Sequence, residues 1–250
     1  MARRMHRVGG STYSRQPFRP QFDQLRDLGF DYAEIDLTWV RANPDDLRRE
    51  AFGLADLLRI ETAHLPPPRY SKSHLDEFRG FLAALVPVGC RVFNVHLVES
   101  RFVAAVPLDR KIPWLRELVD AASGMDALVT LENLDESIDT LHAVFDAVPA
   151  LRFCLDVGHA SLDGSAEQPF RLLDAFGSRL ALVHAHDNRQ GHGEAADLHL
   201  PFGRGTIQLE PILRGVSRRG FDGPVTIELF TGTREEKADS LARARAWLGD

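Results

Sequence analysis

The chain has 250 residues, of which 44% are hydrophobic and 26% charged, with 19 glycines, 14 prolines and no low-complexity tract. This composition excludes a disordered or fibrous protein and supplies enough apolar material for a sizeable core. The formal net charge of −6 disfavours a general polyanion binder, although a local basic groove is compatible with an acidic surface.

The two cysteines, Cys90 and Cys154, form no CxxC pattern, so they indicate neither a disulfide framework nor a thiolate metal site. No stretch approaches the roughly 18 consecutive apolar residues of a membrane span. The Arg-rich start MARRMHR continues into Gly-Gly-Ser-Thr rather than an apolar signal core. We therefore expect a soluble, cytoplasmic protein without a membrane partner.

Short apolar runs with β propensity alternate along the chain with longer stretches of helical periodicity, which is typical of parallel strands covered by helices. The predicted strands are 5–9, which is weak, 31–37, 60–65, 91–97, 127–132, 151–156, 180–186 and 224–229. The predicted helices are 20–29, 45–59, 73–86, 111–122, 136–147, 167–176, 208–219 and 233–248. Eight units of about 31 residues match a (β/α)8 barrel. The predicted fold class is therefore α/β, with residues 1–250 forming a single TIM barrel domain.

Each predicted strand from the third onward ends in a side chain of a metal-ligand type. These residues are His64, His96, Glu132, Asp156, His184 and Glu228. In a parallel barrel the carboxyl ends of all strands meet at one mouth, so we expect these side chains to converge there. Three further candidates lie on adjoining loops: His159, Asp197 and His199. Imidazole and carboxylate ligands suit Zn²⁺ or Mn²⁺, and the set is large enough for one to three ions.

A single histidine at a strand end is more often a hydrogen-bonded structural residue than a metal ligand. Six such coincidences, however, would bury several mutually repelling carboxylates without a counter-ion, which is costly in a low-dielectric mouth. The joint pattern therefore favours a metal site.

Side-chain alternation gives an independent indication, because residues two apart on a strand face the same way. One layer below the candidate ligands lie mostly small or polar residues: Thr62, Asn94, Thr130, Cys154, Leu182 and Thr226. The intervening residues are all apolar: Ala63, Val95, Leu131, Leu155, Val183 and Ile227. This pattern predicts ligands that point into the barrel above hydroxyl and amide groups, with the apolar residues facing the helices.

The segments EIDL, HLP, NVH, LEN, LDVGH, VHAHDN, DLHLPFGRG and IELF, spread over about 31–230, carry a resemblance to a known family. Together they resemble the xylose isomerase-like barrels, which include sugar-phosphate isomerases and epimerases and the endonuclease IV repair enzymes. For Glu132, Asp156, His184 and Glu228 the resemblance implies the four-ligand divalent site of ketose epimerases, whose two glutamates flank the carbon that exchanges its proton. It also matches His64, His96, His159, Asp197 and His199 to the further positions with which endonuclease IV holds three zinc ions.

Two features depart from endonuclease IV. The chain has Asp156-Val157-Gly158-His159 where that enzyme has a DTCH-like step, and its DLHLPFGRG is closer to the isomerase-like members. The chain is also shorter than endonuclease IV and has short loops around the predicted mouth of the barrel.

The leading hypothesis is a divalent-metal-dependent isomerase or epimerase of a sugar or sugar phosphate, which works through a metal-stabilised enediolate. In this hypothesis Glu132 and Glu228 are catalytic and exchange the proton as base and acid. The candidate substrate-binding residues are Asn133, His159, His186, Arg69 and Arg204. The two arginines are candidates for holding a phosphate.

Two alternatives remain open from the sequence. One is an endonuclease IV-like multi-zinc phosphodiesterase that cleaves abasic-site DNA, with Glu132 bridging the ions, and only this alternative has a nucleic-acid partner. The other is a non-catalytic metal-containing barrel that binds a small ligand. The substrate, the metal and its number of ions, and the oligomeric state stay open.

Overall fold

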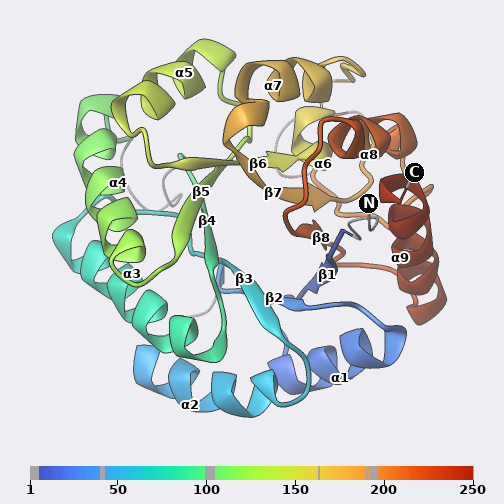
Figure 1. Ribbon diagram of the computed structural model, residues 1–250, viewed down its shortest axis with the longest axis horizontal. Helices are drawn as coiled ribbons and strands as arrows, with labels where there is room; N and C mark the ends of the chain where they lie inside the picture. The colour runs from blue at the N-terminus through green and yellow to red at the C-terminus, as the bar shows by residue number, and fades with distance from the viewer. Residues whose placement is uncertain are drawn as a thin grey trace.

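The computed structural model describes residues 6–39, 43–98, 105–162, 164–189, 191 and 196–249. Its eight parallel strands form a closed barrel in chain order, with β8 pairing back to β1, and the helices form a ring around it (Figure 1). This arrangement confirms the predicted α/β class and the (β/α)8 TIM barrel.

The strands follow the predicted order and lie close to the predicted ranges. They are β1 (Val8–Ser11), β2 (Ala33–Asp36), β3 (Ile60–His64), β4 (Val92–His96), β5 (Leu128–Glu132), β6 (Arg152–Asp156), β7 (Leu180–Ala185) and β8 (Val225–Ile227). The predicted first strand, 5–9, is misplaced, because the two glycines are part of the strand rather than its end. A Cβ on Gly9 would lie 2.2 Å from the ring of Tyr32, so a glycine is required for β1 to pack there.

The eight predicted helices are all present with shifted ends. They are α1 (Phe18–Leu28), α2 (Pro44–Ala55), α3 (Lys72–Leu85), α4 (Leu108–Ser123), α5 (Ile138–Ala147), α7 (Gln168–Phe176), α8 (Leu209–Arg218) and α9 (Arg234–Leu248). Local signals set several boundaries: the Asn43 side chain caps α2 by accepting from the Asp45 N–H, and Pro44 occupies the first turn. None of the helices in the described residues combines the length and apolar character that a membrane crossing needs.

Three short elements have no counterpart in the prediction. They are η1 (Val86–Val88), α6 (Val157–Ala160) and η2 (Gly177–Arg179). The turn α6 matters for the site, because it begins directly after β6 and carries His159. Its first residue follows Asp156, whose side chain caps the turn by accepting from the His159 N–H at 2.6 Å.

The core has two parts, as the side-chain alternation predicts. Residues Ala63, Val95, Leu131, Leu155, Val183 and Ile227 belong to the large cluster between sheet and helices. Inside the barrel, Val92, Cys154 and Leu182 form a separate small cluster. Cys154 and Leu182 belong to the layer directly below the candidate ligands, so this layer combines polar side chains with a small apolar cluster.

Candidate metal centre

The predicted ligands meet at the carboxyl ends of β3 to β8, and their ligand atoms form groups within 4.8 Å of one another. We call Glu132, Asp156, His184 and Glu228 the four-ligand group. We call His64, His96 and Glu132 the two-histidine group, and His159, His186, Asp197 and His199 the loop group. The structure therefore brings together all nine residues predicted as metal ligands.

Glu132 lies at the centre of these groups and is fully buried. Its Oε2 is 3.2 Å from His184 Nδ1 and 3.3 Å from His64 Nε2. Its Oε1 is 3.0 Å from His159 Nδ1 and 3.4 Å from His96 Nε2. The two oxygens of a single carboxylate thus face histidines of every group.

The polar layer below holds Glu132 in place. The Asn94 side chain donates to Glu132 Oε2, and Thr130 Oγ1 donates to Asn94 Oδ1 at 2.8 Å. Both supporting residues belong to the inward-facing layer that the sequence pattern predicts. They fix the orientation of the carboxylate from beneath, as the outer-shell partners of a metal ligand do.

Several buried atoms in the four-ligand group and around it make no hydrogen bond to any residue that the structure describes. They are Glu132 Oε1, His159 Nδ1, His184 Nδ1 and Glu228 Oε2. They approach one another within ion-pair distance but without hydrogen-bond geometry, and unpartnered buried polar atoms are rare in proteins. A divalent cation would satisfy them together, and the nitrogen and oxygen set fits Zn²⁺ or Mn²⁺.

The pKa shifts of the candidate ligands are also consistent with a divalent cation at this site. Burial raises the pKa of Glu132, but the adjacent His184 and His96 outweigh it and hold that pKa well below its ordinary value. For His64, burial lowers the pKa, but the carboxylates, Glu132 foremost, raise it to about 9. In the protein without an ion, the carboxylates thus favour protonated histidines. A bound cation would replace the positive charge of these protons.

The ends of β6 and β8, the two strands that flank β7, supply the remaining ligands of the four-ligand group. Glu228 directly follows β8, and its Oε2 is 3.4 Å from His184 Nδ1. Burial raises the pKa of Glu228, but His184 and His199 hold it below its ordinary value. Asp156 Oδ2 is 3.9 Å from the same His184 nitrogen. His184 Nδ1 therefore faces three carboxylates.

The loop after β7 supplies Asp197 and His199. Asp197 Oδ2 lies 3.1 Å from His159 Nε2 and 3.2 Å from His199 Nε2. Asn188 holds the segment that carries Asp197 and His199. Its Oδ1 accepts from the Leu198 and His199 N–H groups, and its Nδ2 donates to Asp197. His199 has a φ of +45°, a left-handed backbone that the Asn188 contacts stabilise.

His186 and Asn133, both predicted to contact substrate, are buried against Asp156. His186 Nε2 is 3.1 Å from Asp156 Oδ1, and its ring stacks on His199 at 3.8 Å and 11°. Nearly parallel rings cannot both aim an in-plane lone pair at one ion, so His186 in this position supports Asp156. The Asn133 amide donates to the Asp156 carbonyl at 3.0 Å and accepts from the Asp156 N–H at 2.9 Å.

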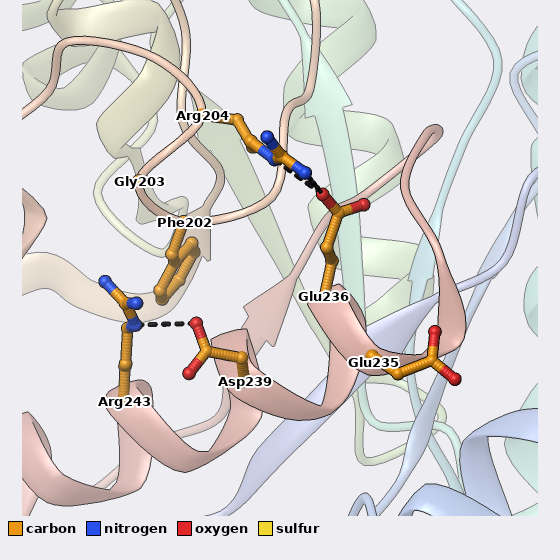
Figure 2. Close-up of a pocket in the computed structure, with 7 residues that line it drawn as sticks. All are labelled: Phe202, Gly203, Arg204, Glu235, Glu236, Asp239 and Arg243. Carbon is orange, nitrogen blue, oxygen red and sulfur yellow. Dashed lines mark hydrogen bonds and ion pairs between the residues drawn. The ribbon is translucent and has the colours of Figure 1, made fainter.

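The two arginines predicted to hold a phosphate lie apart from these groups. Within the described residues, no hydrogen bond or ion pair joins either guanidinium to a candidate ligand. Arg69 is exposed, and its backbone N–H donates to His74 Nδ1. Arg204 pairs with Glu236 of α9 in a cavity of about 390 Å³ that Asp239 and Arg243 also line (Figure 2).

The sequence prediction missed Glu34, Asp36 and Asn188. Glu34 and Asp36 lie on β2, two positions apart, so the alternation rule could have placed both on the inner face. Asp36 Oδ2 accepts from the Ser14 N–H at 2.9 Å and ties the β1 loop to β2. Asn188 follows the ligand strand β7, but no spacing indicates that it caps a loop ten residues away.

Comparison with known proteins places these features in a family. The family model described as the xylose isomerase-like TIM barrel matches residues 22–250. An uncharacterized protein of Methanocaldococcus jannaschii is 28% identical over 52% of this chain, and the match spans only 45% of that relative. The L-ribulose-5-phosphate 3-epimerase UlaE of Escherichia coli is 25% identical over 89% of this chain and 86% of its own.

Solved structures share the fold at lower identity. A D-tagatose 3-epimerase-like protein has a TM-score of 0.76 at 21% identity and covers 96% of this chain and 97% of its own. The IOLI protein with a bound zinc atom has a TM-score of 0.73 at 17% identity, covering 97% of this chain and 98% of its own. With its matched residues extending over most of the barrel, the chain belongs to the xylose isomerase-like TIM barrel family.

Proposed function

We propose that the protein is a divalent-metal-dependent epimerase or isomerase of a sugar or sugar phosphate. The observation that carries this proposal is the four-ligand group, in which glutamates from β5 and β8 approach the same His184 nitrogen at 3.2 Å and 3.4 Å. The sugar epimerases among the relatives support the same class of reaction.

Four residues would hold the ion: Glu132, Asp156, His184 and Glu228. When bound, the ion would polarise a substrate carbonyl and its neighbouring hydroxyl and so stabilise the enediolate. The protein's own part is proton transfer at the neighbouring carbon, for which one carboxylate must accept the proton and the other must return one.

Glu132 and Glu228 suit this exchange by position and charge. They come from β5 and β8, so a substrate between them would present opposite faces of its carbon to the two carboxylates. Neighbouring histidines hold the pKa of both groups below its ordinary value, so both carboxylates are ionised in the protein without an ion. The one that accepts the substrate proton can do so directly, and the one that returns a proton must first take one up. Each glutamate would keep one oxygen for the proton while the other contacts the ion.

One observation favours the multi-zinc phosphodiesterase as a second candidate. The two-histidine group and the loop group adjoin the four-ligand group around Glu132, and an epimerase with one ion has no need of them. In that case the residues of the three groups would hold the ions, and such ions would supply the activation of a water for phosphodiester hydrolysis.

The experiment compares both reactions on the same preparation. Protein purified without added ions is analysed for bound metal and then incubated in D₂O with ketoses and ketose phosphates, with deuterium incorporation followed by NMR. We expect deuterium at a substrate carbon in the metal-loaded protein and none in Glu228→Gln.

The other outcomes decide between the remaining candidates. Nicking of an abasic-site duplex without deuterium exchange would replace the epimerase by the phosphodiesterase. Bound metal with neither activity would favour a ligand-binding barrel. A protein that binds no divalent ion at any concentration tested would contradict all three.

A further inference from the structure

A carboxylate outside the ligand groups lies directly behind one of the ligands. Glu34 of β2 is fully buried, and its Oε2 is 3.2 Å from His184 Nε2. The same oxygen accepts from Thr62 Oγ1 at 2.7 Å. Its Oε1 makes no hydrogen bond within the described part of the chain.

The sheet fixes the position of this carboxylate. The register of β2 against β3 sets Glu34 opposite Thr62, directly after an irregularity between Ala33 and Glu34. Close by in the interior, the Tyr32 hydroxyl and Thr226 Oγ1 hydrogen-bond to each other at 2.9 Å. Glu34 is thus held by its backbone register and by Thr62, and in the described part of the chain it reaches the site through its contact with His184.

An isolated buried carboxylate is costly unless a positive charge compensates it. Among the described residues, no lysine or arginine forms an ion pair with Glu34, and its ion-pair partner is His184. A cation bound to Nδ1, on the side of the imidazole away from Glu34, would compensate the negative charge of the Glu34 carboxylate. The location of Glu34 is therefore explained if His184 lies between a carboxylate and a metal ion.

The same contact determines which nitrogen of His184 can bind the ion. An ionised carboxylate only accepts hydrogen bonds, and a neutral imidazole carries its hydrogen on one nitrogen. Glu34 therefore selects the form of His184 with hydrogen on Nε2. This leaves the Nδ1 lone pair free, and Nδ1 is the atom that faces Glu132 and Glu228.

His64 differs from His184 in the partner behind its ring, because its Nδ1 lies 3.0 Å from the Leu65 carbonyl. His199 Nδ1 lies 3.2 Å from the Glu228 carbonyl and 3.6 Å from the Glu228 carboxylate. A carboxylate partner makes the ligating nitrogen more electron-rich than a carbonyl does. The effect of Glu34 should therefore concern the four-ligand group more than its neighbours.

We propose that Glu34 is a positioning residue that fixes His184 with hydrogen on Nε2 and strengthens ion binding by the four-ligand group. This inference rests on the proposed function, because it requires that group to bind a divalent ion. It goes further in assigning a role to a residue of β2, a strand that supplies no ligand.

The test measures ion affinity directly. Dissociation constants for Zn²⁺ and for Mn²⁺ alone are determined on metal-free protein by competition with a chromogenic chelator. We expect Glu34→Gln to weaken binding at the tightest site about 10-fold and Glu34→Ala up to about 100-fold, the range measured for outer-shell partners of metal ligands. Glu34→Gln keeps the side-chain volume, so it decides the test if Glu34→Ala does not fold.

Glu61→Gln is the matched control. Glu61 is a buried carboxylate on the neighbouring β3, but it pairs with Arg7 at 2.6 Å, and among the described residues no hydrogen bond or ion pair joins it to a candidate ligand. We expect its removal to lower the unfolding temperature and to leave the metal dissociation constant unchanged. An equal loss of affinity in Glu34→Gln and Glu61→Gln would mean that general destabilisation is the cause, which contradicts the proposal.

A spectroscopic measurement separates positioning from stability. In protein with ¹⁵N-labelled histidine and bound zinc, His184 should show a protonated Nε2, identified by loss of its signal in His184→Gln. We expect this signal to shift or vanish in Glu34→Gln. Wild-type affinity and an unshifted signal in Glu34→Gln would overturn this inference alone, whereas a wild-type protein that binds no ion would overturn the proposed function as well.

Discussion

Oε1 of Glu132 lies 3.0 Å from Nδ1 of His159, so the strand end of β5 touches the short turn that follows β6. The opposite oxygen of Glu132 faces His64 and His184 at 3.3 Å and 3.2 Å. Glu132 is therefore the physical link between the three ligand groups. Any ions bound there would have this carboxylate as a common neighbour.

Glu132→Gln should abolish tight metal binding and reduce turnover by more than the roughly 10²–10⁴-fold that a general base alone contributes. The amide cannot supply the negative charge that the surrounding histidines and ions require. Metal content by mass spectrometry and deuterium exchange into substrate check this prediction. Glu136→Gln is the control, since Glu136 follows the same strand and instead accepts from the Leu134 N–H at 2.9 Å. Unchanged metal content in Glu132→Gln would contradict the central role of this residue.

The ligand groups should fill in order. The four-ligand group offers three carboxylates and a histidine, so we expect it to bind zinc first, and the other groups to bind at higher concentration. His96→Ala should then lower the saturating zinc content by one ion while the tightest dissociation constant stays unchanged. Isothermal titration of metal-free protein measures both quantities. A loss of the tightest site in His96→Ala would show that the groups do not bind independently.

Much of the site can be predicted from the sequence because the fold itself brings the residues at the strand ends together. In a parallel barrel every strand ends at the same mouth, so a ligand type at a strand end, such as His96 or Asp156, already implies proximity. The alternation of side chains then gives the inward direction. Both inferences use information that is local to one strand.

The features that the sequence did not reveal depend on contacts between distant segments. Glu34 and His184 are 150 positions apart and meet across the barrel interior, which no spacing rule encodes. Arg204 lies in a loop whose composition suggests anion binding, yet its partner is Glu236, which also belongs to the capping box of α9. In each case the partner, rather than the residue type, determines the role.

Gly158→Ala should disturb the site without removing any ligand. A Cβ at Gly158 would lie 2.0 Å from Cε1 of His186, so the imidazole that contacts Asp156 would have to move. We expect a loss of about 1–3 kcal/mol in the free energy of unfolding, as for other overpacked cores. Weaker metal binding should accompany it. Urea denaturation and metal competition measure the two effects.

Gly53→Ala is the matched control for that substitution. Gly53 lies inside α2, and a Cβ there would meet no atom of the described residues within 4 Å. Removing a glycine from a helix interior should stabilise the protein by about 0.5–1 kcal/mol and leave metal binding unchanged. If Gly158→Ala behaved like Gly53→Ala, the tight packing of His186 would have no energetic consequence.

The pKa of His74, a residue outside the metal centre, predicts how the free energy of unfolding depends on pH. His74 is a buried residue of α3 whose Nδ1 accepts from the Arg69 N–H at 2.9 Å, and its ring packs against Phe78 with centroids 4.5 Å apart. Burial, assisted by the charge of Arg69, lowers the pKa of His74 to about 4, although Glu77 lies 3.3 Å from its Nε2. The folded protein therefore keeps this imidazole neutral in mildly acidic solution.

The unfolded chain takes up a proton at His74 near its ordinary pKa of 6.5, well before the folded protein does at about 4. Between these values the unfolded state binds more protons, so the free energy of unfolding must fall as pH decreases from 6.5 towards 4. The advantage of wild type over His74→Gln should accordingly be smaller at pH 4.5 than at pH 7.5 in urea denaturation, because the variant lacks this proton uptake. The exposed His142→Gln is the control for the same change of residue type. A wild-type advantage over His74→Gln that is equal at both pH values would mean that the buried imidazole titrates alike in both states, and that burial does not control its charge.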